Sequence, residues 1–219
     1  MYNDANSLIV IDHHESAKNN LEGLDFCKFD MSKSGAVLLW EYLFPNVEVP
    51  ILLKYIQDRD LWNWELKDSR EVSAGLQLIP YTDYSEYNKY LNNVEPLKLK
   101  GSAILEYQNK IIGGIERSID YLPLVRLTNC DTRLPLLNTT TLISEIGNML
   151  SITFGGAVMY FDKGDKRIFS LRSNGEIDVS KIAEAYNGGG HKAAAGFSID
   201  FKDLDFEAMH GPKRIIRKK

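Results

Sequence analysis

The sequence of 219 residues is poor in cysteine and has no long apolar run. Its two cysteines, Cys27 and Cys130, stand far apart and outside any Cys-x-x-Cys pair, which indicates reduced thiols and fits a cytoplasmic protein. No apolar stretch approaches the roughly 20 residues of a membrane-spanning helix, and no charged start followed by a long apolar segment indicates a secretory signal. We therefore expect a globular, cytoplasmic chain with no membrane partner.

An excess of positive charge is also lacking. The 26 lysines and arginines face 30 aspartates and glutamates, and the formal net charge is -4. Proteins that hold long duplexes normally carry a basic face, so this balance argues against such a partner. The one dense basic run lies at 213–219, and we interpret 207–219 as a solvated basic tail, with contact to a phosphate backbone as the alternative.

The spacing of apolar residues changes character near the middle of the chain. It predicts helices over 34–44 and after Pro50, two helices within 70–91, and a long helix over 96–120 in which Gly113-Gly114 indicates a bend or a close helix contact. Beyond Pro123 it predicts strands over 124–127, 134–137, 156–161, 167–171 and 197–201, with a helix over 141–150, a hairpin turn at 162–165 and a helix that Asp178 caps. We expect an α/β fold of two domains.

Asp12-His13-His14 directly follows the apolar run 7–11, which predicts a buried strand. Ligands of open α/β sheets gather at the carboxyl ends of strands. An acidic side chain and two imidazoles there can bind a divalent ion and contact a phosphate. The alternative is a surface histidine pair that bonds to the backbone of a turn.

Asp58-Arg59-Asp60 lies at the expected end of the helix that follows Pro50. Carboxylates at such a place are usually solvated or paired with the intervening arginine, so alone this cluster is a weak signal. The nearby Trp62 and Trp64 are expected in the core rather than as surfaces on which a ligand stacks.

Arg172-Ser173 and the run 187–191, which contains Gly188, Gly189, Gly190 and His191, form a third candidate site. Consecutive glycines let the backbone approach a ligand and turn N–H groups toward one anion. His191 can donate to the same anion, and Arg172 offers a bidentate guanidinium to a phosphate. The alternative is a glycine turn between a helix and a strand, with an incidental histidine.

In order and spacing these motifs resemble the DHH phosphoesterase superfamily, in the subfamily with a C-terminal DHHA1 domain. The resemblance begins at Asp12-His13-His14, includes Asp58, and covers most of 134–197, where 169–173, 178–183 and 188–196 carry its specific residues. It implies the C-terminal part of a doubly wound parallel-sheet DHH domain at 1–95, a helical connector at 96–121 and a smaller α/β DHHA1 domain at 122–206. The group includes RecJ-like exonucleases, oligoribonucleases and exopolyphosphatase-related proteins.

The resemblance also implies roles for the residues of each motif. His13 and Asp58 would ligate a divalent metal, typically Mn²⁺, Asp12 would be an acidic partner, and His14 would contact the scissile phosphate. Residues that would hold a substrate phosphate are Arg172, Ser173, Gly188, Gly189, Gly190 and His191. The implied reaction is hydrolysis of a phosphodiester in a short single-stranded oligonucleotide or a small nucleotide by metal-activated water, in either direction of cleavage.

The sequence departs from this family at its start, because two aspartate motifs that family members carry before Asp12 are not present. His13 and Asp58 are two ligands, too few for a tight Mn²⁺ site without further donors. We therefore expect a phosphohydrolase that is impaired or inactive alone, and a homodimer or a second chain that supplies the missing part of the sheet. The alternative is a non-catalytic module that binds nucleic acid or nucleotides through the DHHA1 glycine loop.

Overall fold

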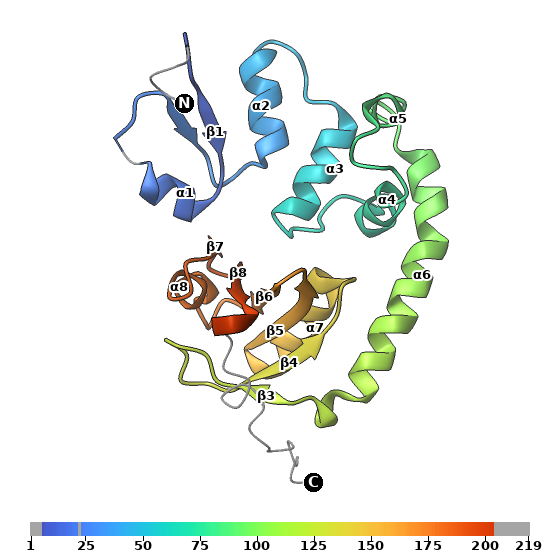
Figure 1. Cartoon of the computed structure of the whole chain (residues 1–219). Helices are drawn as coiled ribbons and strands as arrows, with labels where there is room; N and C mark the ends of the chain where they lie inside the picture. Colours follow the sequence, from blue (N-terminus) through green and yellow to red (C-terminus); the bar gives the residue numbers. More distant parts are fainter. Residues whose placement is uncertain (1–5, 22, 204–219) are drawn as a thin grey trace. The chain divides into compact units, whose positions relative to one another are not determined.

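The computed structural model describes residues 6–21 and 23–203, in two compact units, 1–109 and 110–219 (Figure 1). The expected α/β class is confirmed, while the expected basic tail at 207–219 lies outside the described residues. Within the described part of the chain, no helix combines the length and the apolar character that crossing a membrane requires.

A two-stranded parallel sheet opens the first unit. β1 (Val10–Asp12) pairs with β2 (Cys27–Phe29), and the short helix α1 (Glu15–Asn20) connects the two strands. The expected buried strand at 7–11 is corrected: β1 begins at Val10 and is half-buried, and Leu8 and Ile9 are exposed. Parallel strands are buried on both faces only where neighbouring strands and helices cover them, and β2 is the single strand that pairs with β1 among the described residues.

The helices of the first unit follow the expected pattern. They are α2 (Gly35–Leu43), α3 (Ile51–Asp60), α4 (Ser69–Leu76), α5 (Tyr84–Asn88) and the long α6 (Glu95–Arg117). The Ser34 hydroxyl accepts a hydrogen bond from the backbone N–H of Val37 and caps α2, and Pro50 precedes the first residue of α3. Their core is an apolar cluster of Leu52, Val72, Ile79, Tyr90, Val94 and Leu97.

Glycines let α4 and α6 approach closely. A Cβ atom added at Gly101 would lie 1.7 Å from the carbonyl oxygen of Glu71, and one at Gly75 would lie 2.2 Å from the carbonyl oxygen of Leu97. By contrast, a Cβ atom at Gly113 would have no neighbour closer than 3.7 Å. A close helix contact, one of the two interpretations of Gly113-Gly114, is therefore made at Gly75 and Gly101 instead.

One side of α2 is apolar and exposed. Leu39, Tyr42 and Leu43 on the helix and Phe44 at its end are each more than 40% exposed. A hydrophobic surface of this kind is typical of a site that another chain or segment covers.

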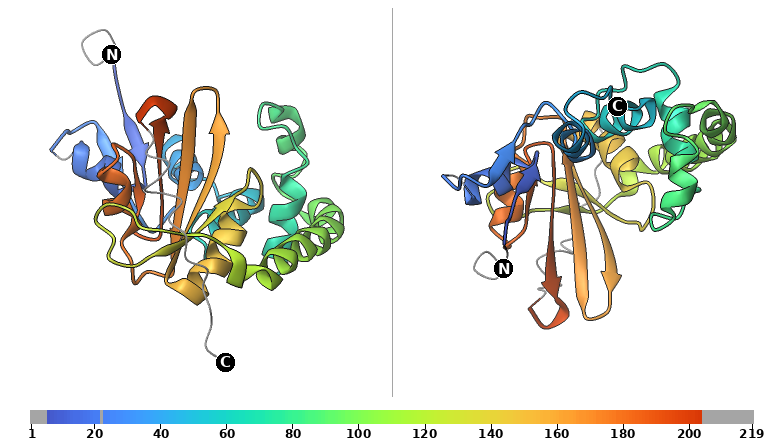
Figure 2. Two further views of the ribbon diagram at one scale, coloured as in Figure 1. Left: turned by 60° about the horizontal axis from the view of Figure 1, so that its bottom comes forward. Right: turned by 90° about the horizontal axis from the view of Figure 1, so that it is seen from above.

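The second unit is built on a six-stranded, mostly antiparallel sheet of order β3-β4-β5-β6-β8-β7. The strands are β3 (Leu124–Val125), β4 (Leu134–Asn138), β5 (Gly156–Lys163), β6 (Lys166–Ser173), β7 (Gly189–His191) and β8 (Ala194–Asp200). The expected turn at 162–165 joins β5 to β6, with Gly164 in the left-handed conformation (φ 62°). Figure 2 shows this long hairpin with β8 beside it.

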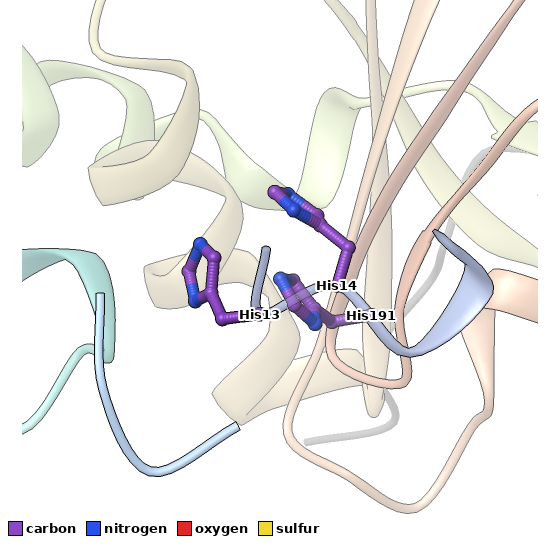
Figure 3. Close-up of side chains that lie close together, drawn as sticks. All are labelled: His13, His14 and His191. Atoms are coloured by element: carbon purple, nitrogen blue, oxygen red, sulfur yellow. The ribbon is translucent and has the colours of Figure 1, made fainter. Parts of the chain in front are cut away.

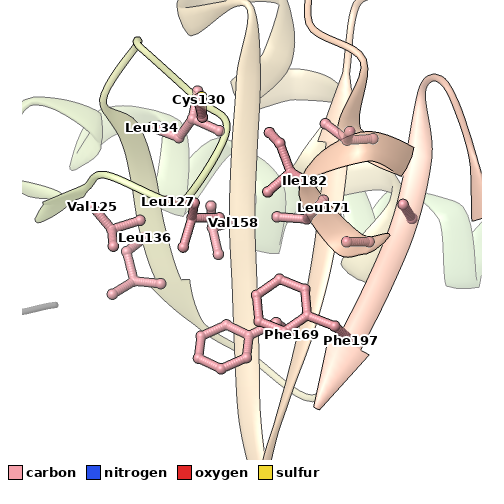
Figure 4. Packing of buried hydrophobic residues seen from close by; sticks show 13 residues of the cluster. Val125, Leu127, Cys130, Leu134, Leu136, Val158, Phe169, Leu171, Ile182 and Phe197 are labelled. Atoms are coloured by element: carbon pink, nitrogen blue, oxygen red, sulfur yellow. The ribbon is translucent and has the colours of Figure 1, made fainter. Parts of the chain in front are cut away.

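Helices cover both faces of this sheet. Ala157 and Met159 of β5 pack with Ile146 and Leu150 of α7 (Ile143–Phe154). Val158, between them, packs in a second cluster that includes Ile182 of α8 (Val179–Glu184) (Figure 4). Because successive side chains of a strand point to opposite faces, the alternation along β5 sets the two cores on the two faces of the sheet.

We predict that Gly101→Ala destabilises the chain by about 1–3 kcal/mol or more, because its Cβ atom would overlap the backbone of α4. Gly113→Ala in the same helix is the matched control and should be neutral or stabilising by up to roughly 1 kcal/mol, since alanine favours a helix over glycine. Urea unfolding of both variants gives the two free energies. Equal effects would contradict the close approach of α4 and α6.

Candidate functional site

The end of β1 holds a hydrogen-bonded turn built on Asp12. Its Oδ1 accepts hydrogen bonds from the backbone N–H groups of His13 (2.7 Å) and His14 (3.3 Å) and lies 2.7 Å from the Nδ1 atom of His14. Burial alone would raise the pKa of Asp12, but the hydrogen bonds and the charge of the His14 ring outweigh it and hold the pKa below its ordinary value. A carboxylate only accepts, so Nδ1 of His14 is the donor of this hydrogen bond.

His13 is brought together with Asp60, at the end of α3. The two rings of His13 and His14 meet edge to face, with centroids 4.6 Å apart (Figure 3). His13 is buried, and its Nε2 atom lies 3.4 Å from Oδ2 of Asp60, whose side chain is 45% exposed. The family resemblance implies Asp58, two positions earlier on the same helix, as the carboxylate that ligates a metal together with His13.

Asp58 is buried and serves the loop that follows α3. Its Oδ1 accepts from the backbone N–H of Glu65 (2.9 Å) and its Oδ2 from that of Leu66 (3.2 Å), while its carbonyl oxygen accepts from Asn63 (2.9 Å). Residues two apart on a helix face different sides, which separates this carboxylate from that of Asp60. Helical spacing is the signal in the sequence that distinguishes the two aspartates.

The loop from 61 to 68 is strained. Trp62, Trp64 and Asp68 all have φ between 58° and 60°, a left-handed conformation that is an outlier for bulky residues and costs of order 1–3 kcal/mol each. The indole Nε1 of Trp64 is buried and has no hydrogen-bond partner among the described residues. Both tryptophans are half-buried and lie outside the apolar clusters, so the expectation that they are core residues is corrected.

Arg172 and Ser173 end β6 beside the start of α7. The Arg172 guanidinium donates to the carbonyl oxygen of Leu171 (2.8 Å) and to the hydroxyl of Ser144 in the first turn of α7 (2.9 Å). Burial lowers the pKa of Arg172, and the charge of Glu145 opposes that shift. The Ser173 hydroxyl donates to the carbonyl oxygen of Ile177 (2.6 Å), so its present role is to close a turn.

The glycine run, expected as a loop, forms an edge strand of the sheet. Gly189, Gly190 and His191 form β7, which pairs with β8; His191 is the third side chain drawn in Figure 3. A Cβ atom at Gly188 would lie 2.2 Å from the carbonyl oxygen of Gly196, and Gly190 has φ 146°. These glycines therefore let β7 lie close against β8, whatever else their N–H groups bind.

The predicted site residues thus fall into two groups, one in each unit. Asp12, His13, His14 and Asp58 belong to the first unit, in which His13 also lies beside Asp60. The residues predicted to hold phosphate belong to the second unit. Arg172 and Ser173 end β6, and the glycine run with His191 forms β7, with α8 between the two strands in the sequence.

Comparison with known proteins links the second group to a domain family. Residues 138–207 match the DHHA1 domain, a range that contains Arg172, Ser173 and β7. The chain is 32% identical over 210 residues to an uncharacterized protein of Acanthamoeba polyphaga mimivirus, covering 90% of this chain and 49% of that protein. It is 24% identical over 210 residues to oligoribonuclease NrnB of Bacillus subtilis, covering 87% of this chain and 52% of that protein. The chain therefore spans about half the length of these curated relatives.

Two solved structures are also similar. An uncharacterized protein from Helicobacter pylori has 18% sequence identity and a TM-score of 0.36, covering 87% of this chain and 67% of its own. A pGpG-specific phosphodiesterase from Vibrio cholerae has 14% identity and a TM-score of 0.39, covering 78% of this chain and 69% of its own.

We predict that Asp58→Asn lowers the free energy of unfolding by about 1–3 kcal/mol, because one of its two backbone amides loses its acceptor. Asp60→Asn is the matched control at an exposed position and should change stability by less than about 0.5 kcal/mol. Urea unfolding of the two variants measures both values. A larger loss for Asp60→Asn would contradict the role of Asp58 in the loop.

Proposed function

The chain belongs to the DHH/DHHA1 superfamily, and from that premise we propose that it takes part in hydrolysing phosphodiesters of short oligonucleotides or small nucleotides. The observation that carries this proposal is the imidazole of His13 beside the carboxylate of Asp60, 3.4 Å apart, directly after β1. Members of the superfamily depend on divalent metal ions, and a nitrogen donor beside an oxygen donor at this place could ligate such an ion.

The donor chemistry at the end of β1 fits a divalent transition ion. Imidazole nitrogen together with carboxylate oxygen suits Mn²⁺ and its neighbours, and His13 and Asp60 would hold the ion. When bound, such an ion lowers the pKa of water and polarises a phosphoryl oxygen. Asp12 fixes the His14 ring, and the family resemblance assigns this ring to contact with the scissile phosphate. Asp58 is the ligand that the family resemblance assigns, and the variants below separate it from Asp60.

We expect the chain alone to be impaired, because His13 and one aspartate give two protein donors. Tight binding of a divalent ion needs further donors from the substrate or from another polypeptide segment. The exposed apolar side of α2 and the two-stranded sheet β1–β2 support a partner that extends this sheet, either a second copy of the chain or a chain with additional strands.

A binding function without catalysis is the second candidate, and Arg172 favours it. A guanidinium has five N–H donors, of which two bond to Leu171 and Ser144, so others stay available to an anion. The first turn of α7 beside it carries the positive end of the helix dipole, which favours the same anion. A phosphate could be held there without any metal ion.

We predict that Mn²⁺ binds the chain weakly and that His13→Ala and Asp60→Asn each lower the affinity by more than about tenfold. Calorimetric titration of Mn²⁺ into the full chain measures this, with Asp58→Asn titrated in parallel. A loss in Asp58→Asn but not in Asp60→Asn would restore the ligand that the family resemblance assigns.

Turnover of short oligonucleotides, pAp and an aryl phosphodiester should be slow for the chain alone and absent in His13→Ala. Fast turnover by the wild-type chain that His13→Ala abolishes would contradict the expected impairment and keep the enzymatic assignment. If the chain neither bound the metal nor turned over a substrate, even with a partner present, both the metal site and the enzymatic assignment would be contradicted.

We predict that Arg172→Ala weakens the binding of pAp by about 10- to 150-fold in the presence of a chelator, since hydrogen bonds from a charged donor are worth about 1.5–3 kcal/mol. Arg133→Ala, an exposed arginine of the same unit, is the matched control and should bind pAp as the wild type does. Equal affinities for all three proteins would exclude phosphate recognition by Arg172.

A further inference from the structure

We propose that Trp62 and Trp64 form a stacking surface for the base of a nucleotide whose phosphate lies at the metal site proposed for His13 and Asp60. The proposal rests on the proposed function and makes it more specific. It selects nucleotides as the ligand class, over polyphosphates and sugar phosphates, which have no base to stack.

The backbone of the loop is the first argument. Trp62 and Trp64 both adopt the left-handed conformation, which glycine or asparagine would adopt with less strain. Strained residues of this kind persist where surrounding interactions impose them, and they gather at sites that bind ligands. Here the imposing group is Asp58, whose oxygens accept backbone hydrogen bonds from Asn63, Glu65 and Leu66. A strained loop is thus held in one conformation with two indoles on it.

The arrangement of the rings is the second argument. The Trp62 and Trp64 rings meet edge to face, with centroids 5.0 Å apart and planes at 76°. The guanidinium of Arg70 lies over the Trp64 ring, 4.4 Å from its centroid, and fixes that ring from a second side. Both indoles are half-buried and neither belongs to an apolar cluster, so aromatic surface stays accessible. We assign the base to Trp62, since Trp64 is held by two neighbours.

The third argument is that the loop directly follows Asp60 of the proposed metal site. Trp62 follows Asp60 by two residues, and its backbone N–H donates to the carbonyl oxygen of Arg59, which keeps the turn tight against the end of α3. Two residues span at most about 7 Å, a separation that one nucleoside bridges between phosphate and base. Stacking on an aromatic ring tolerates every base, so the surface would set the ligand class rather than the sequence.

The test compares two ligands that differ by the base. Calorimetric titration of AMP and of ribose 5-phosphate, each with Mn²⁺, into the full chain should give an affinity for AMP that is about 5- to 150-fold higher. Trp62→Leu should remove this preference and leave the affinity for ribose 5-phosphate unchanged. Trp62→Phe should keep part of the preference, because a smaller ring still stacks.

Trp40→Phe is the matched control, since the Trp40 ring contacts Phe44 of the same unit and is not assigned to the ligand. It should bind both ligands as the wild type does, and circular dichroism checks that every variant is folded. Equal wild-type affinities for AMP and ribose 5-phosphate, with His13→Ala weakening both, would overturn the stacking surface and retain the proposed function. If Trp62→Leu lowered the affinities for AMP and for ribose 5-phosphate equally, Trp62 would have a structural role only. Binding of neither ligand would overturn both proposals.

Discussion

The candidate site of the first unit depends on one buried carboxylate. Asp58 lies inside the unit, 5% exposed, and backbone N–H groups of the loop after α3 supply its hydrogen bonds. Burial of a carboxylate without hydrogen-bond donors is costly. The hydrogen bonds that Asp58 accepts therefore hold the loop against the end of α3. Because Asp58 faces the loop, Asp60 faces another side of α3, where it meets His13. The strained tryptophans and the pairing of imidazole with carboxylate are two consequences of the same interaction.

Elsewhere in the chain, the close approach of two backbones fixes how neighbouring elements pack. Gly75 and Gly101 let α4 and α6 lie closer than any side chain would allow, and Gly188 and Gly190 do the same for β7 against β8. In the second unit this brings the His191 strand into the sheet that also carries Arg172. The glycines of the family pattern are therefore needed for the packing of β7 against β8, in addition to any contact with phosphate.

The sequence predicts local structure well here because the signals are local. Ser34, Pro50 and Asp178 stand at helix starts as expected, and Gly164 makes the β5–β6 turn. It fails where the answer depends on contacts between distant segments. No residue near Gly101 in the sequence indicates that Glu71 packs against it. The apolar run before Asp12 has the composition of a buried strand, although it is partly exposed in the structure. The choice between Asp58 and Asp60 likewise needs the direction of each side chain from α3.

An ion held by His13 must be bound to an imidazole nitrogen. Electron spin echo spectroscopy of the Mn²⁺-loaded chain detects the coupling between the ion and such a nitrogen directly. We expect a nitrogen modulation in the wild-type spectrum that is lost in His13→Ala and kept in His14→Ala, because the ring of His14 is held by Asp12 and assigned to phosphate. A bound Mn²⁺ ion without nitrogen coupling, or coupling that survives in His13→Ala, would contradict the assignment of the metal site.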